Sequence, residues 1–95
     1  MTIGFDIYNG KGFKIHFENG CTVSVQFGNG SYCSDPEFSE TRQTHHCRNA
    51  EIAGFDAKGN WICLPEWKDD VSGWNSPAQV LEFMNYVAGL PAAEQ

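Results

Sequence analysis

The chain contains the stretch FKIHFENGCTVSVQF at residues 13–27, where apolar residues occupy every second position on both sides of an Asn19-Gly20 pair. An apolar period of two is typical of a strand that buries one face. Asn-Gly is a strong signal for the tight turn of a hairpin, because both residues tolerate positive φ angles. The stretch therefore predicts a β-hairpin with one apolar and one polar face, and it places His16 on the polar face as a surface residue.

The residues upstream of this hairpin predict one more strand. Ile3, Phe5 and Ile7 alternate with other residues, and a glycine-containing turn follows at residues 9–12. The same period of two indicates a short strand with an apolar face. We therefore expect it to extend the sheet of the hairpin.

The chain downstream predicts a second hairpin. Its expected parts are a strand at residues 50–56, a turn at 57–60 and a strand at 61–64. Ile52 and Phe55 would lie on opposite faces of an unbroken strand, so we expect either a bulge at Gly54 or partial coverage of both faces. With the segments above, this predicts an antiparallel sheet of about four to five strands.

A C-terminal helix is predicted at about residues 77–89. Ser76 stands at the N-cap, Pro77 at the first helical position, and Gln79 completes a capping box. Gly89 ends the pattern. The apolar residues at helical spacing are Val80, Leu81, Met84, Val87 and Ala88. This stripe is expected to cover one face of the sheet, which makes the predicted fold class α+β.

Composition and charge limit the possible functions. The 95 residues predict a single domain, 1–95, and a net charge of −6 with only six lysines and arginines disfavours direct nucleic-acid binding. The same charge favours a basic partner. The chain starts without a signal-peptide pattern and has no apolar run of about 18 residues, which predicts a cytoplasmic protein with no membrane segment.

The segment 28–49 is the predicted functional region. It lies between the two hairpins, has almost no aliphatic residues, and is expected to be irregular. Long irregular segments in small domains are usually either functional or disordered. This segment contains Tyr32, Cys33, His45, His46, Cys47 and Arg48.

A zinc site is one interpretation of these residues. Its ligands would be Cys33, His45 or His46, Cys47 and Cys63, because thiolate and imidazole are ligands that zinc prefers. No pair of ligands has the short spacing of known zinc motifs. The preferred interpretation is therefore that Cys21 and Cys63 are core residues, and that Cys33 and Cys47 either pack within the segment or are free thiols in a reducing compartment. We therefore expect no cofactor and no enzymatic activity, with the zinc domain as an alternative.

Aromatic and charged residues outside the apolar stripes form the preferred prediction, a surface that binds a partner protein. Its members are Tyr32, His45, His46, Arg48, Trp67, Asp69, Asp70 and Trp74. Both Trp67 and Trp74 have a structural alternative, in which they fold back beside the helix and cover the ends of the sheet.

The chain resembles a family of small acidic proteins encoded by bacteriophages and prophages, most of them described as hypothetical. The resembling stretches are residues 12–20, 22–28, 49–53, 72–74 and 77–85. The resemblance implies a phage accessory protein that acts in the host cytoplasm and binds and inhibits a bacterial defence component. It implies no catalytic residues.

Two further possibilities follow from the residues. The first is a sponge for a small nucleotide signal, in which Tyr32 or Trp74 stacks on the base and Lys14, Arg42 or Arg48 contacts phosphate. The second is a homodimer formed through exposed edges of the sheet.

Overall fold

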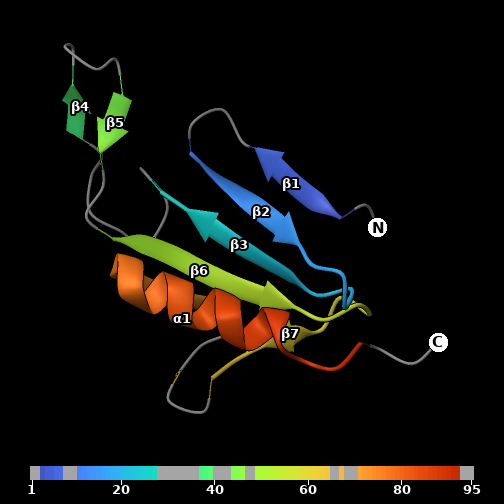
Figure 1. Ribbon diagram of the computed structural model, residues 1–95. Helices are drawn as coiled ribbons and strands as arrows, with labels where there is room; N and C mark the ends of the chain where they lie inside the picture. Colours follow the sequence, from blue (N-terminus) through green and yellow to red (C-terminus); the bar gives the residue numbers. More distant parts are fainter. Residues whose placement is uncertain are drawn as a thin grey trace.

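The computed structural model describes residues 3–7, 11–27, 37–39, 44–46, 49–64, 67 and 71–92, and of 37–39 and 44–46 it describes the backbone only. The elements follow in the order β1 (Gly4–Ile7), β2 (Gly12–His16), β3 (Thr22–Gln26), β4 (Glu37–Ser39), β5 (Thr44–His46), β6 (Ala50–Phe55), β7 (Trp61–Ile62), β8 (Val71–Asn75) and α1 (Pro77–Ala88) (Figure 1). This order confirms the predicted α+β fold with an antiparallel sheet and one C-terminal helix.

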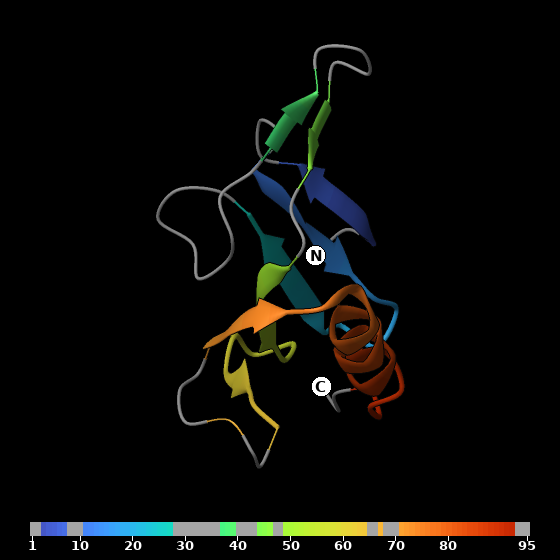
Figure 2. The same ribbon diagram turned by 90° about the vertical axis from the view of Figure 1, so that its left-hand side faces the viewer.

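The main sheet has six strands. Its order is β1-β2-β3-β6-β7, and β8 also pairs with β6. β7 pairs with the end of β6 at Gly54 and Phe55, whereas β8 pairs with its first residues, from Ala50 to Ala53. The two short strands therefore share one edge of β6, and β1 forms the opposite edge of the sheet. α1 runs along β6 on one face, and β8 leads directly into it (Figures 1 and 2).

The predicted hairpin at residues 13–27 is confirmed as β2 and β3, joined by a turn in which Gly20 has a φ of +89°. Asn19 has a different role from the one expected. Its side-chain amide donates to the carbonyl oxygens of Val87 at 2.8 Å and Leu90 at 2.9 Å, at the C-terminal end of α1. The turn therefore supplies donors to one carbonyl in the last turn of the helix and to one just beyond its end.

The capping box predicted for the helix is confirmed, since Ser76 accepts from the Gln79 backbone and Gln79 accepts from the Ser76 backbone. The predicted buried stripe is partly wrong. Phe83 and Val87 are the fully buried residues of α1, whereas two predicted members, Leu81 and Ala88, are exposed. The reason is the position of Phe83, whose large ring lies next to Gly54 and sets the rotation of the helix.

No bulge occurs at Gly54 in the pairing of β6 with β3. The register runs without interruption through Val23↔Gly54 and Val25↔Ile52, and the irregularity lies instead where β6 meets β8. Both faces of β6 are partly covered, as the alternative prediction stated. Ile52 is buried on the helix side, and Phe55 packs against Trp61, with ring centroids 4.6 Å apart.

Three strands were not predicted. β8 follows the acidic connector and contains Ser72 and Gly73, which are weak strand formers. Its Asn75 is buried and donates to the carbonyls of Ser72 and Ala50, which compensates for the poor propensity.

The expectation that residues 28–49 lack regular structure is also wrong, because β4 and β5 form a separate two-stranded sheet within this segment. Few aliphatic residues mark these strands, so no apolar period indicated them.

The core lies between α1 and the middle of the sheet. Its buried members are Cys21, Val23, Val25, Ala50, Ile52, Phe83 and Val87. Within the described ranges, no helix has the length and apolar character that crossing a membrane requires.

Candidate functional site

The edge strand β1 exposes a row of large apolar side chains. Ile3, Phe5 and Ile7 are 63%, 65% and 79% exposed. Cross-strand partners share a face of a sheet, and the register pairs Phe5 with Ile15 and Ile7 with Phe13. The next pairs lead to Val23 and Val25 of the core. Phe5 and Ile7 therefore lie on the same face of the sheet as α1, and Ile3 directly precedes the strand.

This apolar face stays open because one helix cannot cover a six-stranded sheet. A helix is about 10 Å wide, and neighbouring strands are about 4.8 Å apart, so one helix covers two or three strands. In this chain α1 packs against β3, β6 and β8. β1 and much of β2 lie beyond its reach (Figure 2).

Two adjoining hollows occupy the open face. One has a volume of about 390 Å³ and lies between the sheet and α1, where Val80, Leu81 and Met84 line it. The other has a volume of about 450 Å³ and is lined by Phe5, Ile7, Gly12, Phe13 and Phe27. The first is also lined by Phe13 and Phe27, so the two adjoin at these residues. We call them together the apolar groove.

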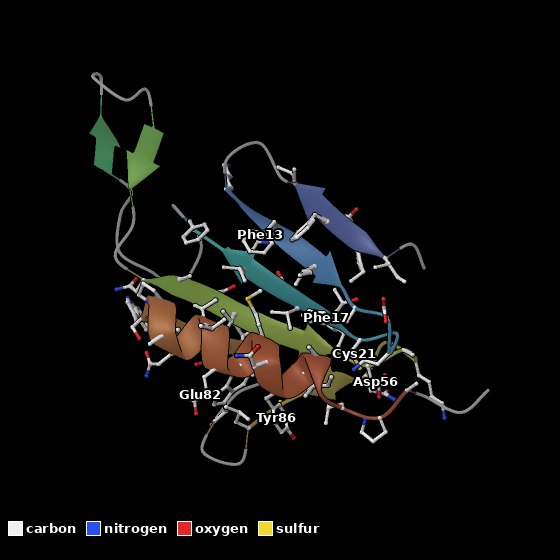
Figure 3. The ribbon with its side chains drawn as sticks, viewed as in Figure 1. Phe13, Phe17, Cys21, Asp56, Glu82 and Tyr86 are labelled. Atoms are coloured by element: carbon white, nitrogen blue, oxygen red, sulfur yellow. The ribbon has the colours of Figure 1, made fainter. Side chains whose placement is uncertain are left out.

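Among the described residues, no charged side chain lines the apolar groove. Phe13 lies at its centre, and its ring contacts Phe5 edge to face at a centroid distance of 6.1 Å (Figure 3). On α1, Glu82 and Tyr86 project away from β1 and β2 (Figure 3). The groove therefore offers contact area and shape rather than ionic recognition. A surface of this kind is typical of a site that binds apolar side chains of another protein.

Trp67 and Trp74 differ in their surroundings. Trp67 packs on Phe83 with ring centroids 4.7 Å apart and borders the core, as the structural alternative stated. Trp74 is 62% exposed, so the alternative does not hold for it. Its φ of +53° lies in the left-handed region, which a residue with a large side chain rarely adopts. Trp74 is thus a strained, exposed aromatic on β8, at the edge of the sheet opposite β1.

A third cleft, of about 440 Å³, separates Trp67 and β8 from the middle of α1. Its lining combines the apolar Ile52, Leu64 and Phe83 with the polar Ser72 and the carboxylate of Glu82. Among the described residues of the lining, Glu82 is the one charged group. The described part of this cleft therefore supplies a single carboxylate.

His16 takes part in a hydrogen-bonded chain across three strands on the polar face, so its interpretation as a simple surface residue is wrong. Its Nε2 lies 2.9 Å from Asp6 Oδ2, and its Nδ1 lies 2.9 Å from Thr22 Oγ1. These residue types also form hydrolytic triads. Thr22 is only 7% exposed in the middle of the sheet, and none of the three residues lines one of the hollows described above. The chain of bonds therefore connects β1, β2 and β3 rather than activating a nucleophile.

The cysteines separate into a core residue and an exposed one. Cys21 is buried, as expected, and Cys63 is exposed, so the interpretation of Cys63 as a core residue is wrong. Burial raises the pKa of the Cys21 thiol, and the neighbouring Asp56 carboxylate raises it further. In the described part of the chain, no three acidic, histidine or cysteine side chains gather closely enough to hold a metal ion. Cys33 and Cys47 lie outside that part.

Four of the eight predicted partner-binding residues lie outside the described residues, namely Tyr32, Arg48, Asp69 and Asp70, as does Arg42 of the nucleotide hypothesis. His45 and His46 belong to β5, of which the backbone alone is described. Trp67 and Trp74 are the members of the predicted surface whose side chains are described, and Trp67 borders the core whereas Trp74 is exposed. The structure adds Ile3, Phe5, Ile7 and Leu81, which sequence reasoning assigned to buried faces.

No protein-family model, no curated protein and no solved structure matches this chain. The class that the fold defines is a small α+β protein with an antiparallel sheet half covered by one helix. The resemblance to phage proteins stays a prediction.

Proposed function

We propose that this protein is a non-enzymatic binding protein whose apolar groove receives apolar side chains of a partner protein. The observation that carries the proposal is the continuity of the groove with the exposed row on β1. Phe5 and Ile7 belong to both, so that one uncharged surface extends from the edge of the sheet to α1. Exposed apolar surfaces of this extent on small proteins are usually contact sites.

The chemistry of the groove favours a protein over a phosphate-bearing ligand. No lysine or arginine of the described residues lines it, and these residues offer no counter-charge to a phosphate group. Lys14 points to the other face of the sheet, since its cross-strand partner is Ser24, and its ammonium lies 6.0 Å from the Phe55 ring. The nucleotide sponge therefore depends on residues outside the described part of the chain.

The partner we propose is a bacterial defence protein with basic residues around an apolar contact. The net charge of −6 supports the proposed basic residues on the partner, because complementary charge speeds association and favours the correct partner. The resemblance to small phage proteins supports the choice of a defence protein. Inhibition would follow from occupation of the partner's surface, without a chemical step.

The test is capture of proteins from bacterial lysate by three forms of the protein. Leu81→Gln removes an exposed apolar side chain of the groove and keeps charge and helix propensity. Tyr86→Gln makes the same change at another exposed position of α1, which points away from the groove. We expect wild type and Tyr86→Gln to capture a common protein and Leu81→Gln to lose at least about 10-fold in affinity for it. Equal binding by all three forms would show that the apolar groove is not the binding site.

The zinc domain stays an alternative prediction, since three of its four ligands have no described side chain. Native mass spectrometry tests it by measuring the mass of the folded protein against that of the denatured chain. A mass difference equal to one zinc ion, lost after Cys47→Ser, would support the zinc domain. Calorimetry with cyclic and linear nucleotides tests the sponge in the same way.

A further inference from the structure

β1 ends the main sheet, and in the described part of the chain no strand pairs with its outer edge (Figure 1). Such an edge presents backbone donors and acceptors that can pair with another strand. Natural proteins usually protect exposed edges with lysine, proline or a bulge. β1 has none of these, since Gly4–Ile7 reads Gly-Phe-Asp-Ile and its register with β2 is continuous.

The single charge of β1 does not protect the edge either. Asp6 lies on the face opposite to the apolar row, because it falls between Phe5 and Ile7 in an extended strand. There its carboxylate contacts His16 at a distance of 2.9 Å. The helix-side face of the edge is therefore wholly apolar. An unprotected edge with an apolar face indicates a surface that is covered when the protein functions.

We propose that a second copy of this chain covers this edge, with β1 pairing antiparallel to β1 about a two-fold axis at Phe5. In this register Phe5 lies opposite Phe5 of the second copy, and Ile3 lies opposite Ile7. Directly opposed residues share a face, so the Phe5 and Ile7 side chains of both copies gather on the helix side. The two sheets become one continuous sheet.

Charge selects this register over its neighbours. A shift of two positions would centre the axis on Asp6 and place two carboxylates directly opposite each other, which is unfavourable. With the axis at Phe5, each Asp6 lies opposite Gly4 of the second copy. A shift of one position would put the apolar row of one copy beside the polar face of the other. The sequence of β1 is thus self-complementary in one register.

The proposed dimer is small and reversible. β1 has four residues, and an interface built on one short strand pair falls in the size class of transient contacts. We expect a Kd on the order of 10 to 100 μM. The axis is perpendicular to the sheet, so both copies of α1 lie on one face and the two apolar grooves meet between them. The dimer itself does not depend on the proposed function, because it forms without any other protein.

Sedimentation equilibrium on the full chain, from about 5 μM to about 500 μM, tests the proposal at physiological salt. We expect wild type to pass from monomer to dimer over this range. Phe5→Lys and Phe5→Glu should each stay monomeric, because the introduced like charges oppose each other at the axis. An equimolar mixture of the two should form the dimer again, since an ammonium then faces a carboxylate.

Tyr86→Lys is the matched control, because Tyr86 is also exposed but lies on α1 and projects away from β1 and β2. It should dimerise like wild type, and circular dichroism should show that every variant is folded. If wild type stays monomeric at the highest concentration, the proposal is wrong, and the outer edge of β1 would then pair with a different protein. Dimers of Phe5→Lys alone, or no dimer in the mixture, would overturn the register.

Discussion

The ring of Phe83 lies so close to Gly54 that a Cβ on residue 54 would come within 2.8 Å of its Cζ. Gly54→Ala should therefore destabilise the fold by about 1 to 3 kcal/mol, because the added methyl forces the ring out of a packed position. Urea denaturation followed by circular dichroism measures the loss. In the background of Phe83→Leu the same methyl should cost much less, and equal costs in both backgrounds would show that the two side chains do not conflict.

Asn19 connects the β2–β3 turn to the end of α1 through its side-chain amide. Asn19→Asp replaces two short donor bonds with a carboxylate facing helix carbonyls at the negative end of the helix dipole. We expect a loss of about 2 kcal/mol in the free energy of unfolding. Asn85→Asp is the control, because Asn85 is exposed on α1. Similar losses for both variants would contradict the role of Asn19.

Trp74 combines exposure with an unfavourable backbone conformation. Glycine adopts a positive φ without the steric cost of a side chain. Trp74→Gly should therefore be more stable than Trp74→Ala by about 1 kcal/mol, as measured by chemical denaturation. The reverse order would mean that the backbone at residue 74 is not strained. If Trp74 contacts a partner, both variants should weaken that binding equally, since strain in the free protein is a separate effect.

The turn after β6 makes the stability depend on pH. The backbone amide of Asn60 lowers the pKa of Asp56 below its ordinary value, and the amide of Lys58 and the side chain of Asn60 lower it further. The unfolded chain therefore binds more protons, and the contribution of Asp56 is complete above about pH 4 and lost as the pH falls through the lowered value. The melting-temperature difference between wild type and Asp56→Asn should shrink over that range. A difference that stays constant down to pH 2 would contradict this.

The sequence could predict the fold wherever local signals agreed. The Asn19-Gly20 pair lies between two alternating stretches, and Ser76 with Gln79 marks the start of the helix, so the structure confirms both elements. β8 could not be predicted in the same way, because its stability comes from Asn75 bonds to β6 that form only in the folded state. The rotation of α1 also depends on a tertiary fit, the space over Gly54.

The candidate site was harder to predict than the fold. The apolar period of two at Ile3, Phe5 and Ile7 predicts a buried face of a strand. The pattern does not reveal whether another element covers that face, and in the structure these side chains are exposed. The widths of the elements could have indicated the exposed face. A single helix is too narrow to cover a sheet of four or five strands, so part of the apolar face had to stay uncovered. Trp74 was predicted as a surface residue by its position near a turn, and its exposure agrees with this. Its role in binding stays a prediction.

The account depends most on the apolar groove as the surface that binds a partner protein. Hydrogen–deuterium exchange on the captured complex tests this directly, at about 1 μM, where the proposed β1 dimer is dissociated. We predict that the partner slows exchange in residues 3–7, 13–17 and 80–84. Protection confined to residues 71–75, with unchanged exchange in β1 and α1, would contradict the account and assign binding to the edge that carries Trp74.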